Sequence, residues 1–296
     1  MMRISTDNGP IRNMFGDVKA VEMIAAAGFD GIDYTFYDIS KENDILALPI
    51  DEMRALAHEV KAAADWCGIA IPVAHAPFGF KYTDTKDSYA FEEVVRSFEF
   101  AHILGVKKIV VHTIKFPYED YKADVWAFNR QFMLDLLPYA EKFDLMIGIE
   151  NLFIRDKKRA RYVGHNGTPE EVNAFIDSLG SDRFCACCDL GHCALTGREP
   201  EEYIRGMSGE RLTMLHVQDT DYMTDTHTIP YLGKHNWDEI TSALAEIDYK
   251  GYMNLEVLGF YRKFPASMVP DALKMAAQAA RHLADMVDEK KQKMGN

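Results

Sequence analysis

The feature of this sequence that most constrains its fold is an alternation, along the whole chain, of short apolar runs with segments of helical periodicity. The short runs are apolar at nearly every position, which indicates a parallel sheet covered on both faces. We predict eight strands: Arg3–Thr6, Gly31–Phe36, Ile69–His75, Lys108–His112, Met146–Glu150, Phe184–Asp189, Arg211–Val217 and Tyr252–Val257.

Helical segments occupy the intervals between these runs. Thr168-Pro169-Glu170-Glu171 has the residue types of a capping box with proline in the first turn, and it predicts a helix start. The polar tail Glu289–Asn296 is expected to fray. The other predicted helices are Gly16–Ala27, Ile50–Trp66, Tyr89–Leu104, Ala123–Lys142, Trp237–Ile247 and Asp271–Asp288.

Eight strand–helix units in 296 residues favour a single closed (β/α)8 TIM barrel of the α/β class over an open sheet. A dinucleotide-binding sheet is disfavoured because no GxGxxG or phosphate-binding loop follows the first strand. No linker, low-complexity tract or further repeat interrupts the pattern. We therefore expect one domain over residues 1–296.

The charge balance narrows the class of partner. The chain carries a net charge of −13, whereas proteins that bind nucleic acid usually present a basic face to the phosphates. No signal-peptide run opens the sequence, and no stretch approaches the roughly 20 apolar residues of a membrane span. We expect a cytoplasmic enzyme of small polar substrates, with no nucleic-acid or membrane partner. Homo-oligomerisation stays open.

The cysteines do not suggest a disulfide framework. There are five, an odd number, and four of them crowd into one predicted strand and its exit. Their spacing is not that of a zinc knuckle either, so we expect reduced thiols that pack as small apolar residues. They are Cys67, Cys185, Cys187, Cys188 and Cys193.

Six consecutive predicted strands end in a residue that can bind a metal, at the barrel end where active sites are built. A single histidine there is often only a hydrogen-bonded core residue, and an aspartate before Leu-Gly also suits a helix cap. Two glutamates are harder to explain, because buried carboxylates that converge repel each other unless a cation lies between them. The terminal residues are His75, His112, Glu150, Asp189, His216 and Glu256.

From this set we predict a divalent metal bound by Glu150, Asp189, His216 and Glu256. Three carboxylates and one imidazole are an oxygen-rich ligand set, which suits Mn²⁺ best, with Mg²⁺, Co²⁺, Zn²⁺ and Ni²⁺ as alternatives. A second group of residues either holds additional, more zinc-like ions or contacts the substrate, and the sequence leaves both readings open. This group is His75, His112, His192, Asp225 and His227.

These residues, in their sequence settings, resemble the xylose isomerase-like barrel superfamily. That superfamily includes the tagatose/psicose 3-epimerases, inosose dehydratase and endonuclease IV. The resemblance to the epimerases implies the same four metal ligands, with Glu150 and Glu256 as the acid/base pair and His192 as a substrate contact. The motifs that carry it are Gly148-Ile-Glu150-Asn151, Cys188-Asp189-Leu-Gly-His192, Leu215-His216-Val-Gln-Asp219, Asp225-Thr-His227-Thr-Ile-Pro230-Tyr-Leu-Gly233-Lys-His-Asn-Trp237 and Asn254-Leu-Glu256-Val257.

Two details bear on the branch of the superfamily. The stretch after His216 reads Thr220-Asp221-Tyr222, without the arginine of the ketohexose 3-epimerases, which sets the chain apart from them. The resemblance to endonuclease IV implies a three-zinc site, and nine residues have matching types. These are His75, His112, Glu150, Asp189, His192, His216, Asp225, His227 and Glu256.

A DNA-cleaving function is disfavoured by the net acidity, by the Gly-Ile-Glu-Asn-Leu setting of Glu150 and by the scarcity of basic clusters. The exception is Lys157–Arg161, which either is a solvated loop or binds a sugar phosphate or nucleic-acid backbone.

We therefore expect a metal-dependent isomerase or epimerase of a keto-sugar or inosose, acting through an enediolate. The alternatives are a dehydratase or lyase on the same site and a three-zinc endonuclease. Aromatic residues near the strand ends either enclose the sugar or are ordinary packing residues: Tyr34, Phe36, Tyr37 and Phe78.

Overall fold

Eight parallel strands form the central sheet of the protein, in the order β10-β1-β2-β3-β4-β5-β8-β9. The computed structural model describes residues 1–36, 44–116, 124–157 and 161–295. The strands of this sheet are β1 (Ile4–Asp7), β2 (Gly31–Thr35), β3 (Ala70–His75), β4 (Lys108–Val111), β5 (Met146–Glu150), β8 (Phe184–Asp189), β9 (Leu212–His216) and β10 (Met253–Leu255).

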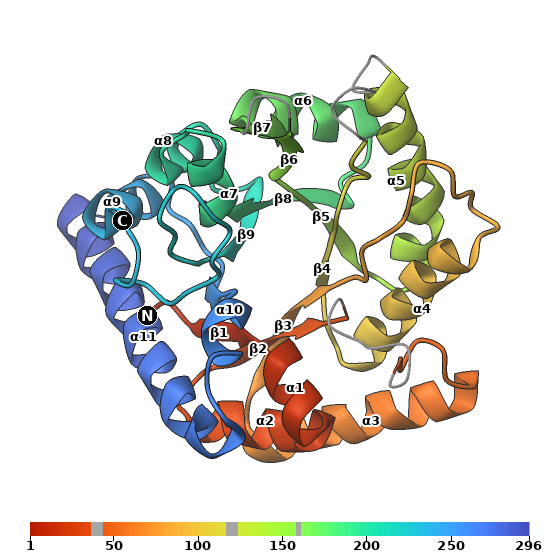
Figure 1. Ribbon diagram of the computed structural model, residues 1–296, viewed down its shortest axis with the longest axis horizontal. Coiled ribbons are helices and arrows are strands. Elements are labelled where there is room, and N and C mark those ends of the chain that lie inside the picture. Colours follow the sequence, from red (N-terminus) through yellow and green to blue (C-terminus); the bar gives the residue numbers. More distant parts are fainter. Residues whose placement is uncertain (37–43, 117–123, 158–160, 296) are drawn as a thin grey trace.

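The sheet closes on itself between β9 and β10. Val217 and Leu255 form a parallel bridge, the Val217 N–H donates to Asn254 O over 2.8 Å, and the Glu256 N–H donates to Val217 O over 3.0 Å. On the other side, β10 pairs in parallel with β1. Figure 1 shows the strands in a central ring with the helices outside it. The predicted (β/α)8 barrel is confirmed.

The long helices lie where helical periodicity predicts them. Their observed and predicted ends differ by no more than two residues, except at the C-terminal end of α11. The Thr168 capping box is present in full at the start of α6, and the predicted start at Ala123 lies outside the described residues. The helices are α1 (Gly9–Phe15), α2 (Asp17–Ala26), α3 (Ile50–Cys67), α4 (Tyr89–Ile103), α5 (Asp124–Lys142), α6 (Pro169–Leu179), α7 (Leu190–Leu195), α8 (Pro200–Arg205), α9 (Trp237–Glu246), α10 (Leu258–Tyr261), the 3-10 helix η2 (Ala266–Met268) and α11 (Val269–Met294).

A two-stranded antiparallel hairpin follows β5 and was not predicted. Its strands are β6 (Leu152–Asp156) and β7 (Arg161–His165), and they pair with Leu152 opposite His165. Buried and more exposed residues alternate along β6, as expected for a hairpin with one face packed on the protein. Because β6 begins two residues after Glu150, the hairpin lies at the C-terminal mouth of the barrel.

The prediction that the tail Glu289–Asn296 frays is wrong for its described residues. Helix α11 continues to Met294 because lysines of its last turns are anchored to neighbouring segments. Lys290 Nζ donates to Asp238 Oδ1 over 2.7 Å and to Ser242 Oγ over 2.9 Å, and Lys291 Nζ lies 3.0 Å from Asp248 Oδ1.

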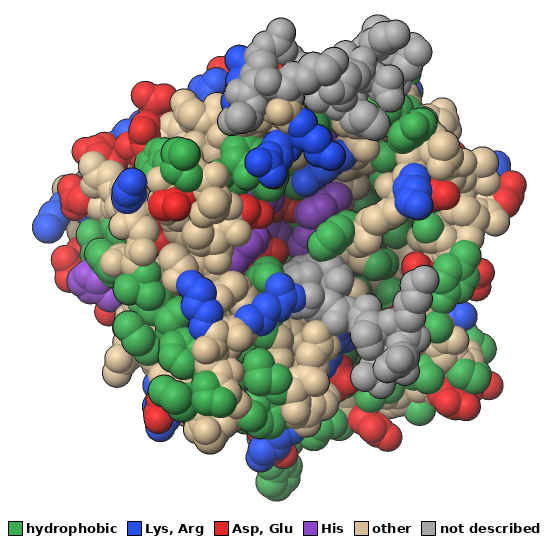
Figure 2. Space-filling model, viewed as in Figure 1, with side chains coloured by type: hydrophobic (Ala, Val, Ile, Leu, Met, Phe, Trp, Pro, Cys, Tyr) green, Lys and Arg blue, Asp and Glu red, His purple; other side chains and the backbone are tan. Residues whose placement is uncertain are grey.

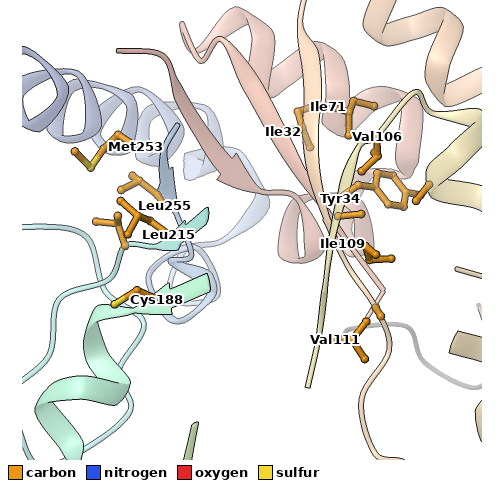
Figure 3. Packing of buried hydrophobic residues seen from close by; sticks show 14 of the residues in the cluster. Ile32, Tyr34, Ile71, Val106, Ile109, Val111, Cys188, Leu215, Met253 and Leu255 are labelled. Carbon is orange, nitrogen blue, oxygen red and sulfur yellow. The ribbon is translucent and has the colours of Figure 1, made fainter. Parts of the chain in front are cut away.

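Two apolar regions stabilise the barrel. The larger lies between the strands and the surrounding helices, and Figure 3 shows side chains of β2, β3 and β4 on one side of the barrel and of β8, β9 and β10 on the other. The smaller region contains Val73, Val110, Cys185, Cys187 and Met214 from β3, β4, β8 and β9, and Met146 of β5 packs against it. The cysteines of β8 are therefore buried among apolar side chains, and all five thiols are free.

Candidate metal centre and active-site pocket

Four residues from four strand ends meet at the C-terminal mouth of the barrel. Glu150, Asp189, His216 and Glu256 are all buried, and each offers one ligand atom, all of which lie within 4.8 Å of one another. Figure 2 shows histidine and acidic side chains gathered in the hollow at the centre of this face. The barrel thus brings together the four residues that the sequence selects as metal ligands.

His216 is held between carboxylates on both edges of its ring. Its Nδ1 lies 3.0 Å from Glu150 Oε1 and 3.5 Å from Glu256 Oε2, while its Nε2 lies 3.5 Å from Asp33 Oδ2. Asp33, on β2, accepts a hydrogen bond of 2.8 Å from Asn254 Nδ2. A carboxylate behind a ligand imidazole fixes its ring and raises its basicity.

Asp189 is fixed by two amide side chains. Its backbone N–H donates to Asn151 Oδ1 over 2.7 Å, and Gln218 Nε2 lies 3.1 Å from each carboxylate oxygen. Gln218 can approach because residue 191 is glycine: a Cβ there would lie 2.5 Å from Gln218 Cδ. The Leu-Gly after Asp189 therefore has a packing role next to the metal candidates.

Two further clusters flank the central one. In the first, His112 Nε2 lies 2.7 Å from Glu150 Oε2 and 3.1 Å from His75 Nε2. In the second, Asp225 Oδ2 lies 3.2 Å from His227 Nε2 and 3.7 Å from His192 Nε2. All nine residues named from the sequence therefore lie at one mouth of the barrel.

Three of these imidazoles have the same orientation. Nδ1 of His75, His192 and His227 lies 2.8 to 3.0 Å from a backbone carbonyl, that of Ala76, Asn151 and Glu256 respectively. A carbonyl can only accept, so Nδ1 carries the proton and, in the neutral ring, the lone pair is on Nε2. Each Nε2 faces the clusters, an arrangement typical of metal-binding histidines.

The electrostatics of the pocket are compatible with cation binding. Burial raises the pKa of Glu256 to about 8. For His192 burial acts to lower the pKa, but Asp189 and Asp225 outweigh it and raise the pKa to about 9. Protonated imidazoles thus offset crowded carboxylates that a divalent ion would otherwise neutralise. The donor set, its burial and its crowding are consistent with divalent metal binding.

The loop that carries Asp225 and His227 is organised by Asp219. Its carboxylate accepts hydrogen bonds from the backbone N–H of Tyr231 over 2.9 Å, from that of His235 over 3.2 Å and from Trp237 Nε1 over 3.1 Å. This buried aspartate stands in the motif after His216, and the sequence does not distinguish its role from that of a ligand.

The clusters open into a cavity of about 470 Å³ that is lined on one side by aromatic and aliphatic residues. Phe78 is among them, with its ring stacked at 5.0 Å on that of His112. Tyr34 and Phe36 do not reach this cavity. They are buried and pack on Phe100 at 5.2 and 5.4 Å, so their interpretation as sugar-enclosing residues is wrong. Tyr37 lies outside the described residues.

The basic segment Lys157–Arg161 lies at the turn of the β6–β7 hairpin, with residues 158–160 outside the described part. Lys157 and Arg161 are exposed, and Arg161 Nε lies 3.5 Å from the buried Asp156 Oδ2. The described residues of this turn do not form a pocket of buried polar groups that could bind an anion.

Three residues with clear positioning contacts were not assigned a role from the sequence: Asp33, Asn151 and Gln218. Asn151 and Gln218 stand in the motifs, but an amide beside a ligand has no signal of its own. Asp33 is a buried carboxylate inside an apolar strand, Gly31-Ile-Asp-Tyr-Thr. Because burial of a carboxylate costs free energy, its position in this strand was the sequence signal that could have pointed to a role.

An α/β barrel with a buried carboxylate–histidine cluster at its mouth defines a broad class of metal-site barrels. Within that class, the sequence profile described as xylose isomerase-like TIM barrel matches residues 21–287, and the chain belongs to this family.

Individual proteins agree with this assignment. The chain is 24% identical over 281 residues to D-psicose 3-epimerase of Enterocloster bolteae, covering 88% of this chain and 85% of the relative. A crystal structure of a D-tagatose 3-epimerase-like protein superposes with a TM-score of 0.73 at 20% identity, covering 98% of this chain and 99% of that one. A D-psicose 3-epimerase solved in the presence of D-fructose gives 0.71 at 16% identity, covering 96% and 99%.

Among the helices in the described part of the chain, none has both the length and the apolar character needed to span a bilayer.

Proposed function

We propose that this protein is a divalent-metal-dependent epimerase or isomerase of keto-sugars, with Glu150 and Glu256 as its acid/base pair. The observation that supports this most directly is that both glutamates are buried and reach one cluster from β5 and from the end of β10, with β8 and β9 between them in the ring. The family and the named 3-epimerase relative agree with the reaction type.

The two carboxylates have different environments, which suits opposite proton-transfer roles. His216 and His112 outweigh the effect of burial and hold the pKa of Glu150 well below its usual range, so this group is ionised. Burial raises the pKa of Glu256 to about 8, and a bound divalent ion would lower it. Such a pair can remove a carbon-bound proton from one face of a sugar and return one to the other.

Glu150, Asp189, His216 and Glu256 would hold the metal, for which Mn²⁺ is the best fit. A bound divalent ion supplies Lewis-acid stabilisation of negative charge next to a carbonyl. His192 and His227 would contact substrate hydroxyls or hold further ions, and the same choice applies to His75 and His112. Phe78 would cover the sugar and exclude water.

The test is exchange of a carbon-bound proton with D₂O, followed by NMR on D-psicose, D-fructose, D-tagatose and inososes with Mn²⁺-loaded protein. Exchange that needs metal supports the proposal, and the product then distinguishes epimerisation, isomerisation and dehydration. A metal-loaded, folded protein that exchanges none of a broad panel would contradict it.

A second function, cleavage of DNA at abasic sites, is favoured by one observation: the two flanking clusters complete nine residues of the types that endonuclease IV uses. Against it stands the net charge of −13, which repels DNA at long range. Elemental analysis and a nicking assay on an abasic duplex separate the two. Three zinc ions per chain with efficient nicking would favour the nuclease.

A further inference from the structure

We infer that the sugar turned over at this site carries a bulky apolar substituent, which lies in a subsite formed by Phe80, Val94 and Phe132. This inference rests on the proposed function, because it assigns the sugar ring itself to the metal clusters. It goes further by assigning the rest of the cavity.

The cavity of about 470 Å³ has two chemically different ends. One end is the cluster of histidines and carboxylates. The other extends over the ends of β3 and β4 toward α4 and α5, and its wall is apolar. The residues of this wall are Phe78, Phe80, Val94, Ile114 and Phe132.

The apolar end is a packed and preformed surface. The rings of Phe80 and Phe132 lie 4.7 Å apart, and Val94 and Phe132 are only 3% and 5% exposed. Phe80 also contacts Phe91 of α4, at 6.4 Å between ring centroids. The wall is therefore fixed by the helices behind it.

Among the described residues, the polar side chains of the cavity are either engaged or lie toward the clusters. Thr113 lines the cavity, but its hydroxyl is hydrogen-bonded to His165 Nε2 at 2.8 Å. Lys115 also lines the cavity, but it lies toward the clusters, where its charge interacts with those of Glu150, Asp225 and Asp189, and its Nζ lies 4.7 Å from the centroid of the Phe153 ring. A hydroxyl placed against Phe80, Val94 and Phe132 would lose its hydrogen bonds to water without replacement.

An unsubstituted sugar would occupy the end with the clusters and leave the apolar end of the cavity unfilled. One apolar ring such as Phe78 can stack on the C–H face of a sugar, but the remaining wall has no complementary surface on a fully hydroxylated molecule. A cavity of this size lies in the range, roughly 300–1,000 Å³, that accommodates ligands larger than a single sugar ring. An aromatic or branched aliphatic group attached to the sugar matches both the size and the polarity.

The experiment compares matched substrates that differ only in the apolar group. The pairs are 6-O-phenyl- with 6-O-methyl-D-fructose, and 1-anilino- with 1-methylamino-1-deoxy-D-fructose, so that the ring is offered at either end of the sugar. With Mn²⁺-loaded protein, kcat/KM for exchange in D₂O should be at least about tenfold higher for the phenyl member of one pair.

Two variants of α4 serve as the test of the subsite and its matched control. Val94→Phe fills the subsite and should reduce the phenyl-to-methyl ratio of kcat/KM toward one. Val95→Phe makes the same substitution at the next residue, which packs on the core and does not line the cavity, and should leave the ratio as it is. Thermal melting checks that both variants are folded.

The outcomes separate this inference from the proposed function. Exchange that is equal within both pairs, or a ratio that Val94→Phe does not change, overturns the subsite and leaves the epimerase standing. If no sugar exchanges, the proposed function fails. In that case, binding of the four sugars, measured by ligand-observed NMR, tests the subsite by itself. Tighter binding of the phenyl sugars that Val94→Phe abolishes supports the subsite, and equal binding of the phenyl and methyl sugars overturns it.

Discussion

At the scale of single residues, the position of each candidate ligand follows from the direction of the strands. Parallel strands of a barrel present their C-terminal ends at the same mouth, so acidic and histidine residues that end consecutive strands must meet there. This is why Glu150, Asp189, His216 and Glu256, spread over more than a hundred residues of sequence, converge within a few ångströms.

Glu150→Gln and Glu256→Gln should each reduce proton exchange by at least about 10²-fold, because each removes a proton-transfer group. Exchange into an active keto-sugar, followed by NMR, measures the loss, and metal content is measured on the same samples because both residues are also candidate ligands. Glu59→Gln, an exposed change on α3, is the control and should retain full activity. Near-normal exchange in either active-site variant would remove that residue from the mechanism.

Gln218→Ala should weaken metal binding about 10- to 100-fold, as substitution of residues that orient ligands typically does. Gln218 Nε2 contacts both Asp189 oxygens and Asp225 Oδ1, and its Oε1 accepts from the His227 backbone N–H. Competition with a fluorescent chelator reports the affinity. Gln131→Ala, on the exposed surface of α5, is the matched control. An unchanged affinity in Gln218→Ala would show that the amide only fills space.

The residue scale also shows where sequence reasoning stops. The ligand candidates could be predicted because a carboxylate at the end of an apolar strand needs an explanation. Asn151 and Gln218 could not, because an amide is tolerated at many strand ends and its partners depend on the packing of neighbouring strands. For Tyr34 and Phe36 the sequence left enclosure of the sugar and ordinary packing open, because strand position alone does not tell which face of the barrel a side chain occupies; the structure shows packing.

At the scale of elements, periodicity predicts the long helices and the eight strands but not the additions at the mouth. The β6–β7 hairpin and the short helix α7 are too short for a periodic signal, and both follow directly after a ligand-bearing strand. Helix α11 extends past its predicted end because Lys290 and Lys291 find acceptors on distant segments. Such tertiary contacts override local helix-end signals.

Helix α4 carries a testable electrostatic feature, Glu93. Burial, and then the hydrogen bond and charge of Asp44, raise its pKa to about 7. The folded state therefore holds a proton that the unfolded chain releases near pH 4.5, and stability is lost as pH rises from that value toward 7. Glu93→Gln removes this loss, so the variant should be more stable than the native protein at pH 8, by about 1 kcal/mol after allowing for partial exposure.

Denaturant unfolding at pH 4.5 and pH 8 measures this effect. The stability difference between the Glu93→Gln variant and the native protein should be small at pH 4.5 and favour the variant at pH 8. Glu92→Gln, at the adjacent exposed position of α4, should show little pH dependence. A native protein whose stability rises over this range relative to Glu93→Gln would contradict the assignment.

At the scale of the whole molecule, closure of the barrel brings the ends of the sequence together around the site. β1 pairs with β10, and Asp7 at the end of β1 accepts a 2.9 Å hydrogen bond from the Val257 N–H, next to Glu256. The position of the last candidate ligand thus depends on the first strand. A cation bound at the centre of the mouth would therefore join segments from the whole chain, and its binding energy would contribute to global stability.

Removal of metal should lower both activity and the melting temperature. At a metal concentration of about 100 times Kd, binding adds about 2.7 kcal/mol to the free energy of unfolding. For a chain of this length, that corresponds to a shift of roughly 4–5 °C in Tm. EDTA followed by gel filtration should produce this decrease and abolish exchange, and Mn²⁺ or Co²⁺ should restore both better than Ca²⁺, since the mixed carboxylate–imidazole donor set favours transition metals.

A matched pair of variants shows whether the shift comes from the central cluster. Asp189→Asn removes one charged candidate ligand and should lose most of the EDTA-induced change in Tm. Asp271→Asn, which changes an exposed carboxylate at the start of α11, should keep it. An EDTA-induced shift of the same size in both variants would place the metal elsewhere, and full activity after verified metal removal would overturn the metal-dependent mechanism.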